Sequence, residues 1–273
     1  MIYVVTAVHN RIKMTRRFVE SLLAQDYVDG IHFILVDDGS TDGSDKMVKE
    51  TYPNSTVLYG NGKLFWGGAL HMAYKHLMAL NLRDEDIIFY ANDDSRFGPN
   101  FLSGLIKLIE KHPNDLAVGC AYGINSQNYL DGPIFFNLKN GAVKHLPAGH
   151  TGNCASTRAL GMKAAVFKDI GGFHPILLPH YGSDYEYTIR AFKKGHKVVS
   201  DKVIRYTFSE DTTGDNSHKN ITLKRIMNKR SKLNPFYKLM FILLIAPIYR
   251  LPSYISYQFK HFNHHDRDSG KAV

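Results

Sequence analysis

The stretch Ile87-Ile88-Phe89-Tyr90-Ala91-Asn92-Asp93-Asp94 joins a run of apolar residues directly to two aspartates. Apolar runs of this length, rich in β-branched and aromatic side chains, predict a buried strand. Two adjacent ionised carboxylates repel each other, so a cation or solvent has to stabilise them where the strand ends. Hard oxygen ligands suit Mg²⁺ or Mn²⁺, and the stretch therefore predicts a divalent metal that bridges to phosphate.

A second junction of the same kind lies earlier in the chain. Ile34-Leu35-Val36 runs into Asp37-Asp38-Gly39-Ser40, so an apolar strand again ends in a pair of aspartates. One such junction is typical of a helix cap, whereas two junctions indicate a site.

The first half of the chain alternates apolar runs with helical patterns. We expect strands over residues 2–8, 31–36, 56–59 and 86–91, and helices from Thr15, after residue 42, over 67–80 and after Pro99. Thr15 is expected to cap the first of these helices. Strands that alternate with helices predict an α/β fold with a mainly parallel sheet covered on both faces.

The middle of the chain has a different pattern. Residues 116–146 hold short runs broken by turns, and Asn140-Gly141 predicts a hairpin. A helix near 162–169 is expected to end at Gly171, followed by a helix over 183–194 and a last strand over 196–206.

Composition and charge limit the classes of function that are compatible with this chain. A net charge of +9 favours an anionic partner, and 44% hydrophobic with 22% charged residues is ordinary for an enzyme. Two cysteines form no metal-ligand spacing, and no uncharged apolar run reaches the roughly 18 residues of a membrane span. The first residues already read as a strand rather than a secretory signal, so we expect a cytoplasmic protein.

Three motifs lie where expected strands end. Ala7 to Arg11 follows the first strand, Asp37 to Ser40 the second, and Asn92 to Asp94 the fourth. Ligands bind outside the carboxyl ends of parallel strands, so His9, Asp38 and Asp94 are expected along one rim. The dinucleotide fingerprint and the P-loop are both absent, which excludes a routine dehydrogenase or ATPase.

Two of these segments have more than one interpretation. Asp38 is able to accept a hydrogen bond from the N3–H of uracil or thymine, or to act as a turn or cap residue before the helix at 42. Asn61, Trp66, Gly67 and Gly68 precede a helix, where glycines let backbone N–H groups approach a phosphate. The alternative there is a loop with one buried tryptophan.

The second half contains a further acidic pair, Asp184 and Glu186, at the start of a helix. Negative charge there favours the helix dipole, and Asp184 is also a candidate base that removes a proton from an acceptor hydroxyl. Glu186 lies roughly 200° further around the helix, so only one of the two is the base. We place Glu186, His180 and Tyr181 on the acceptor side.

The ordered set of motifs resembles the family 2 glycosyltransferases over about residues 1–210. The motifs are Val5-Thr6-Ala7-Val8-His9-Asn10-Arg11, Val36-Asp37-Asp38-Gly39-Ser40-Thr41-Asp42, Asn92-Asp93-Asp94, Gly171-Gly172-Phe173 and Gly182-Ser183-Asp184. The resemblance implies a GT-A fold and sugar transfer from a nucleoside diphosphate with inversion at the anomeric carbon.

The resemblance also implies roles for single residues. Ala7, His9 and Arg11 would lie beside the nucleotide, Asp38 at the base, Asp93 at the ribose or donor sugar, Asp94 on the metal, and Asp184 would be the catalytic base. Asn61 and Trp66-Gly67-Gly68 resemble the rhamnosyltransferase-like branch. The chain departs from the family at Asn92, in place of the first aspartate of Asp-x-Asp, and at Ser183, in place of a glutamate.

We therefore predict metal-dependent, inverting transfer of a single sugar from a UDP- or dTDP-linked donor to a glycan or lipid-linked acceptor, in bacterial surface polysaccharide synthesis. The Gln-x-x-Arg-Trp motif of processive synthases is missing.

One alternative is a nucleotidyltransferase acting on sugar phosphates, which would need a Gly-rich basic loop after the first strand. Another is a non-catalytic basic module that binds lipid or nucleic acid, although the basic residues cluster near one end and no nucleic-acid partner is expected.

The C-terminal part is expected to be a separate unit, with a catalytic domain over 1–215 and a helical extension over 216–273. Within 219–260, basic residues precede the apolar run from Phe236 to Ile245. This order suits an interfacial helix at the inner face of the cell membrane. The alternative is a helix packed on the catalytic domain or on a second copy in a homodimer.

Overall fold

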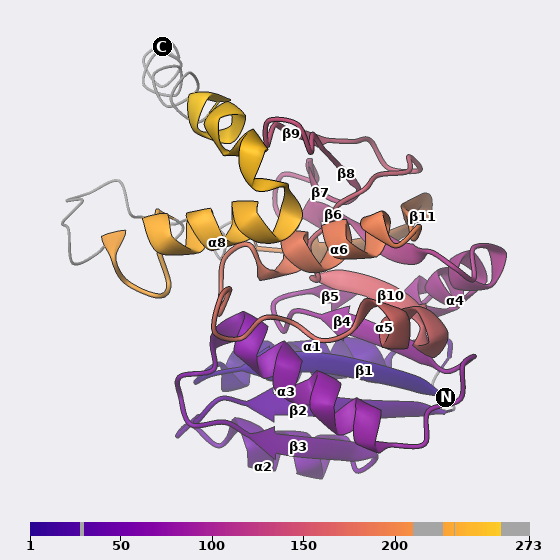
Figure 1. Ribbon diagram of the computed structural model, residues 1–273. Helices are drawn as coiled ribbons and strands as arrows, with labels where there is room; N and C mark the ends of the chain where they lie inside the picture. Colours follow the sequence, from indigo (N-terminus) through magenta and orange to yellow (C-terminus); the bar gives the residue numbers. More distant parts are fainter. Residues whose placement is uncertain (28–29, 210–225, 232, 258–273) are drawn as a thin grey trace, which may run out of the picture.

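The computed structural model describes residues 1–27, 30–209, 226–231 and 233–257 (Figure 1). The strands are β1 (Ile2–Val8), β2 (Ile31–Asp37), β3 (Ser55–Tyr59), β4 (Ile87–Ala91), β5 (Arg96–Phe97), β6 (Leu116–Gly123), β7 (Tyr129–Asp131), β8 (Ile134–Phe136), β9 (Val143–His145), β10 (Ala159–Lys163) and β11 (Val198–Phe208). The described helices include α1 (Ile12–Leu23), α2 (Ser44–Thr51), α3 (Phe65–Ala79), α4 (Phe101–Lys111), α5 (Ala164–Ile170), α6 (Ser183–Lys193), α8 (Pro235–Ile245) and the 3₁₀ helix η3 (Ile248–Arg250).

One large sheet organises the molecule. Its strand order is β3-β2-β1-β4-β10-β6-β11-β5, and β7 pairs with β6. The pairs β1–β2, β1–β4, β2–β3 and β6–β11 are parallel, whereas β10 runs antiparallel between β4 and β6. The predicted α/β fold with a mainly parallel sheet is confirmed.

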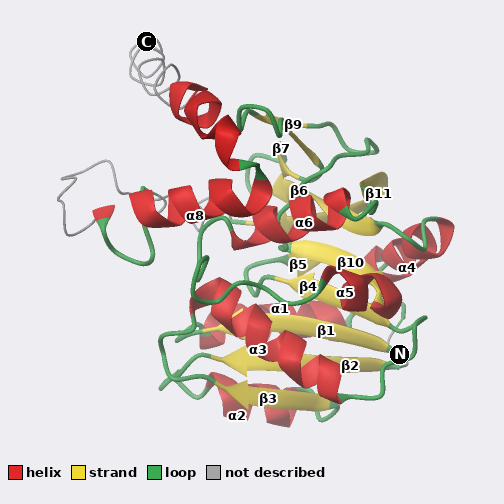
Figure 2. Ribbon diagram, viewed as in Figure 1, coloured by secondary structure: helices red, strands yellow, loops and turns green. Residues whose placement is uncertain are grey.

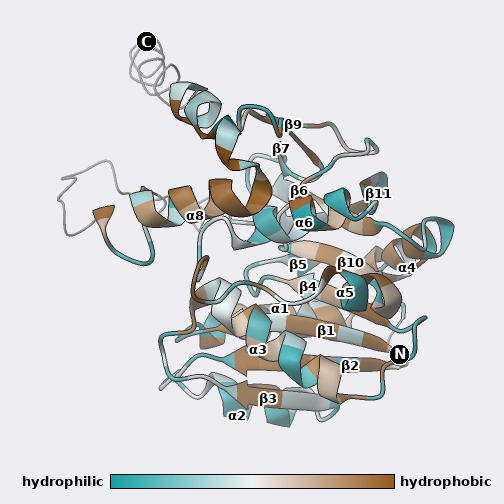
Figure 3. Ribbon diagram, viewed as in Figure 1, coloured by the Kyte–Doolittle hydropathy of each residue, from teal (hydrophilic) through white to brown (hydrophobic). Residues whose placement is uncertain are grey.

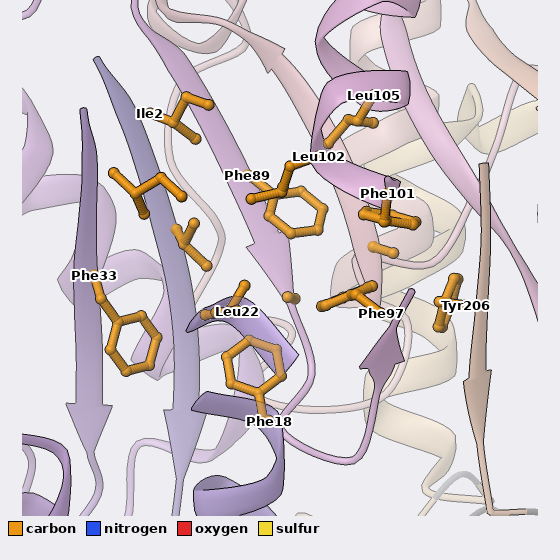
Figure 4. Close-up of a cluster of buried hydrophobic side chains, with 14 of the residues drawn as sticks. Ile2, Phe18, Leu22, Phe33, Phe89, Phe97, Phe101, Leu102, Leu105 and Tyr206 are labelled. Atoms are coloured by element: carbon orange, nitrogen blue, oxygen red, sulfur yellow. The ribbon is translucent and has the colours of Figure 1, made fainter. Parts of the chain in front are cut away.

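Helices cover both faces of this sheet (Figure 2). Apolar residues of α1, α2 and α4 pack on one face, and those of α3, α5 and α6 pack on the other. Figure 4 shows the first of these clusters, in which Phe18, Phe33, Phe89 and Phe97 meet between helix and sheet. Burial on both faces explains why the central strands read as continuous apolar runs.

Two local expectations are corrected. The strand β10 was not expected, and the helix expected near 162–169 begins after it, at Ala164, as α5. Thr15 does not cap α1 but lies buried inside it, because the helix already starts at Ile12. The N–H of Ile12 donates instead to Asp42 Oδ2 at 2.8 Å, so the cap comes from the loop after β2.

The remaining expectations agree with the structure. The hairpin at Asn140-Gly141 is present as β8–β9, with Gly141 at φ +82°, and Gly171 at φ +84° ends α5. The boundary placed at 215–216 lies outside the described residues. Within the described ranges, no helix is long and apolar enough to span a bilayer.

The C-terminal helix packs on the catalytic domain. Ile245, Ala246 and Tyr254 are buried in a cluster with Phe136 of β8 and Ile189 of α6. The described part of this segment therefore packs on the domain, which is the alternative to a membrane contact, and the membrane contact itself stays a prediction.

Candidate active site

The carboxyl ends of β1, β2 and β4 lie side by side, because these strands are adjacent and parallel. A cavity of about 250 Å³, termed the rim cavity, opens at this edge. Its wall includes the predicted residues Ala7, His9, Arg11, Asp38, Trp66 and His180. Segments far apart in the sequence thus meet at this cavity, whereas Asp94, expected on the same rim, lines another one.

Asp38 organises the entrance to α3. Its carboxylate accepts N–H groups from Gly62 at 2.8 Å, Leu64 at 2.9 Å and Phe65 at 3.1 Å. Asp38 therefore caps a helix, but this helix is α3 and not the one that follows residue 42. A carboxylate has about four acceptor positions, so the bond to a uracil or thymine ring stays a prediction.

The glycines of α3 allow close packing. The Gly67 N–H donates to Pro179 O at 2.8 Å, and a Cβ on Gly67 would lie 2.5 Å from Leu178 O. The Gly67 N–H therefore already has a backbone partner in this structure, and the approach of this segment to a phosphate stays a prediction. A Cβ on Gly68 would meet Leu64 Cβ at 3.3 Å, so this position is tight as well.

Asn61 lies outside the wall of the rim cavity. Its side chain is exposed, and Asn61 Oδ1 accepts the Lys63 N–H at 3.0 Å, which shapes the loop before α3. The structure therefore brings Trp66, but not Asn61, to the cavity.

Cations stabilise the aspartate pair after β4, and they are arginines. Arg11 Nη1 lies 3.0 Å from Asp93 Oδ1, and Arg158 Nη1 lies 2.5 Å from Asp94 Oδ1. Arg11 Nη2 is also 3.8 Å from Asp94 Oδ2. Burial raises the pKa of Asp93 to about 6, while Arg11 opposes this shift and Asp94 adds to it.

A divalent metal fits this site only together with phosphate. Among the described residues, no group of three His, Cys, Asp or Glu side chains is placed to hold a metal ion. Mg²⁺ is nevertheless bound in many enzymes by one or two carboxylates plus substrate phosphates and water. Asp94 and Asp93 supply carboxylates of this kind beside a cavity of about 220 Å³ that both residues line.

Asp184 lies close to the rim cavity through a chain of hydrogen bonds. Trp66 Nε1 donates to Thr157 Oγ1 at 2.9 Å, and the Thr157 N–H donates to Asp184 Oδ2 at 3.3 Å. The Ser183 hydroxyl donates to Asp184 Oδ1 at 3.2 Å. Burial raises the pKa of Asp184, although these hydrogen bonds and Arg158 oppose the shift. A carboxylate with a raised pKa beside a cavity has the chemistry of a general base.

Glu186 points into the protein and is bound there. Arg190 donates from Nε to Oε1 at 2.9 Å and from Nη2 to Oε2 at 3.0 Å, and His174 Nε2 lies 3.6 Å away. Despite the opposing effect of burial, these partners lower the pKa of Glu186. Arg190 also donates to Gly172 O at 2.8 Å, so the pair ties α6 to the loop after α5.

His180 and Tyr181 have different surroundings. His180 lines the rim cavity, and its Nδ1 is buried with no hydrogen-bond partner among the residues that the structure describes. Burial, and then Arg230, lower the pKa of His180 to about 4, so the ring is neutral at pH 7. Tyr181 is 46% exposed and lies against the His180 ring, with 4.6 Å between centroids.

Sequence reasoning missed several residues of the site. Phe65 and Arg230 line the rim cavity, and the Arg230 guanidinium lies 5.2 Å from the centre of the Phe65 ring. Thr157 and Arg158 contact Asp184 and Asp94. Phe65 has φ +56°, an uncommon conformation for an aromatic residue. None of these four belongs to a recognisable motif, and Arg230 is known from the sequence only as one of many basic residues.

Residues 3–170 match glycosyl transferase family 2. The chain belongs to this family. A search of curated proteins finds no match.

Solved structures of glycosyltransferases share the fold. The chain is similar to GalNAc-T7 in complex with UDP, GalNAc and Mn²⁺, with TM-score 0.63 and 15% identity over 77% of this chain and 43% of that one. It is also similar to TarS of S. aureus, with TM-score 0.58 and 19% identity over 76% of this chain and 36% of that one. It is similar as well to the mannosyltransferase PcManGT of Pyrobaculum calidifontis in complex with GDP-Man and Mn²⁺. The TM-score is 0.56 and the identity 16%, over 93% of this chain and 73% of that one.

These likenesses show the GT-A fold. The chain spans less than half of the length of the GalNAc-T7 and TarS chains.

Proposed function

We propose that this glycosyltransferase transfers a single sugar from a nucleoside-diphosphate donor to a hydroxyl group with inversion. The observation that carries the proposal is the meeting of the rim cavity with Asp184 through Trp66 and Thr157. The nucleotide occupies the rim cavity, where Arg11 and Arg230 contribute positive charge.

The reaction is a direct displacement. An acceptor hydroxyl gives its proton to Asp184, and its oxygen forms a bond to C1 of the donor sugar while the C1–O bond to the diphosphate breaks. The Thr157 N–H and the Ser183 hydroxyl hold the Asp184 carboxylate in place for this step. The nucleoside diphosphate leaves with the bonding electrons, and the sugar changes configuration once.

Asp94, with Asp93 beside it, would hold a Mg²⁺ or Mn²⁺ ion together with the diphosphate. Such an ion neutralises charge on the leaving diphosphate when it is bound. Arg11 pairs with Asp93 and Arg158 with Asp94, and these contacts hold both carboxylates in position.

Calorimetric titration with UDP, dTDP and GDP, with and without Mn²⁺, tests the proposal. We expect saturable binding of one of them and a higher affinity with Mn²⁺ present. The absence of binding by all three, in either condition, would contradict the proposed donor class.

Finer assignments have support of different kinds. The residues Asn61 and Trp66-Gly67-Gly68 support the rhamnosyltransferase-like branch, and the missing Gln-x-x-Arg-Trp motif supports transfer of single sugars. UDP- or dTDP-linked donors, a glycan or lipid-linked acceptor and a role in surface polysaccharide synthesis follow from that resemblance. A homodimer stays a prediction. No observation favours the nucleotidyltransferase or the non-catalytic module.

A membrane contact through α8 is part of the proposal. Phe236, Leu239 and Leu243 lie on one side of this helix at spacings of three and four residues and are 50%, 38% and 39% exposed. The opposite side packs into the domain through Ile245. Figure 3 shows α8 as predominantly hydrophobic along its length.

The charge around this helix matches an anionic surface. Residues 216–265 contain no Asp or Glu, and their basic residues are Lys219, Lys224, Arg225, Lys229, Arg230, Lys232, Lys238, Arg250 and Lys260. Of these, Lys219, Lys224, Arg225, Lys232 and Lys260 lie outside the described residues. Basic residues beside an exposed apolar stripe are typical of interfacial helices on anionic lipid.

Vesicle flotation tests the membrane contact. The intact chain is expected to float with vesicles of phosphatidylglycerol and phosphatidylcholine but not with phosphatidylcholine alone. The variant Phe236→Gln/Leu239→Gln/Leu243→Gln should lose this binding because the apolar stripe is gone.

A matched control changes three exposed apolar residues elsewhere, Leu23, Met78 and Ile176, to Gln. This control should float like the wild type. Equal flotation of both triple variants would rule out α8 as the contact.

A further inference from the structure

A second cavity lies on β6, β7 and β11, apart from the rim cavity. Its volume is about 430 Å³, compared with about 250 Å³ for the rim cavity. Two tyrosines, Tyr122 and Tyr129, and two cations, Lys202 and Arg205, lie on its wall together with His145. We term it the tyrosine cavity.

The aromatic wall is held in place. The Tyr129 hydroxyl donates to Leu146 O at 2.8 Å, and the two tyrosine rings meet edge to face with centroids 5.6 Å apart. The Arg205 guanidinium lies 4.9 Å from the centre of the Tyr122 ring, and Arg205 Nε donates to Lys202 O at 2.8 Å. Fixed rings and a fixed guanidinium reduce the entropy that a ligand would lose on binding.

The cavity carries positive charge. Lys202 and Arg205 are exposed, and within the part of the chain that the structure describes no carboxylate lies within ion-pair distance of either. Two aspartates lie near this wall: Asp131 Oδ1 is 4.0 Å from His145 Nδ1, and Asp201 precedes Lys202 in β11. An exposed guanidinium group without an ion-pair partner binds carboxylate and phosphate through paired hydrogen bonds.

The wall of the tyrosine cavity is linked to Asp184 through β7 and residues 156 and 157. Tyr129 and Asp131 both belong to β7, whose pairing with β6 shifts register between Ala121 and Tyr122. Asp131 Oδ2 accepts the Ser156 hydroxyl at 2.6 Å, and the next residue, Thr157, donates to Asp184 and accepts from Trp66. Residues 156 and 157 thus connect β7, a strand of the tyrosine cavity, with Asp184 and with Trp66 of the rim cavity.

We propose that the tyrosine cavity binds an anionic sugar unit of the acceptor glycan. The pyranose ring lies against Tyr122 and Tyr129, and its carboxylate or phosphate group binds Arg205 and Lys202. This proposal rests on the proposed function, since it names the acceptor class for the same reaction. The cavity is a specificity site, and its residues do not touch the reacting atoms.

Calorimetry with defined saccharides tests this assignment. The probes are a tetrasaccharide of alternating glucuronate and N-acetylglucosamine, a neutral tetrasaccharide of N-acetylglucosamine, and glucose 6-phosphate. The variant Lys202→Gln/Arg205→Gln should bind the anionic probes at least about 10-fold more weakly, because charge-assisted hydrogen bonds are lost. The control Lys107→Gln/Lys197→Gln removes the same charge from exposed positions elsewhere and should bind like the wild type.

The outcomes separate this proposal from the proposed function. Binding of the uronate probe identifies a carboxylate as the recognised group, and binding of glucose 6-phosphate alone identifies a phosphate. Equal affinity for the neutral tetrasaccharide, or unchanged affinity in the Lys202/Arg205 variant, would overturn the proposal. UDP titration of the same variant should match the wild type, and UDP binding without binding of any saccharide would overturn the acceptor subsite alone.

Discussion

Asp184→Asn is expected to lower the rate of sugar transfer by about 10²–10⁴-fold, the usual contribution of a general base. The amide keeps the shape of the side chain, and its oxygen still accepts the Thr157 N–H, but its NH₂ group accepts neither the Ser183 hydroxyl nor the proton of the acceptor hydroxyl. Release of nucleoside diphosphate in the presence of acceptor measures the effect. Wild-type turnover in this variant would show that Asp184 is not the base.

Two controls accompany this variant. Its nucleotide affinity should equal that of the wild type, because Asp184 is not among the residues of the rim cavity wall. In the wild-type enzyme, burial raises the pKa of Asp184 while the Thr157 N–H and Ser183 lower it. The value of kcat/KM should therefore fall as the pH is lowered through this raised pKa, at a higher pH than an exposed aspartate would give.

Glu186→Ala is expected to lower the free energy of unfolding by about 3–5 kcal/mol, the usual cost of removing one partner of a buried ion pair. Arg190 would keep its charge in a largely buried position, and its link between α6 and the loop at Gly172 would weaken. Urea denaturation of the variant and the wild type measures the difference.

Glu110→Ala is the matched control, since Glu110 is exposed on α4. It should change the free energy of unfolding by less than about 0.5 kcal/mol. A Glu186→Ala variant as stable as the wild type, yet inactive in transfer, would instead identify Glu186 as the base.

The rim was predictable from local sequence patterns. An apolar run that ends in Asp-Asp marks a buried strand and its carboxyl end at β2 and β4, and β1 lies between these two strands in the sheet. The wall positions of His9, Arg11 and Asp38 follow from that arrangement alone. The strand β10 was not predictable, because Ala159-Leu160-Gly161-Met162-Lys163 has no β-branched or aromatic residue and takes its conformation from its neighbours β4 and β6.

The contacts of the site were less predictable than its position. Asp38 caps α3 only because the loop at Gly62 folds back on the end of β2, and no turn pattern encodes that approach. Arg158 pairs with Asp94 across a gap of 64 residues, which a single sequence does not reveal. A metal was predicted because two adjacent carboxylates repel each other. In the described structure, Arg11 and Arg158 supply part of the positive charge that offsets this repulsion.

Trp66 allows the most direct test of the central claim, that the rim cavity binds the nucleotide of a sugar donor. It is the chain's only tryptophan and lines that cavity, so its fluorescence reports on this site. Titration with UDP, dTDP and GDP should give a saturable change in Trp66 fluorescence for at least one of them, and Trp66→Phe supplies the blank. Nucleotide binding seen by calorimetry with no change in Trp66 fluorescence would place the nucleotide elsewhere and contradict the account.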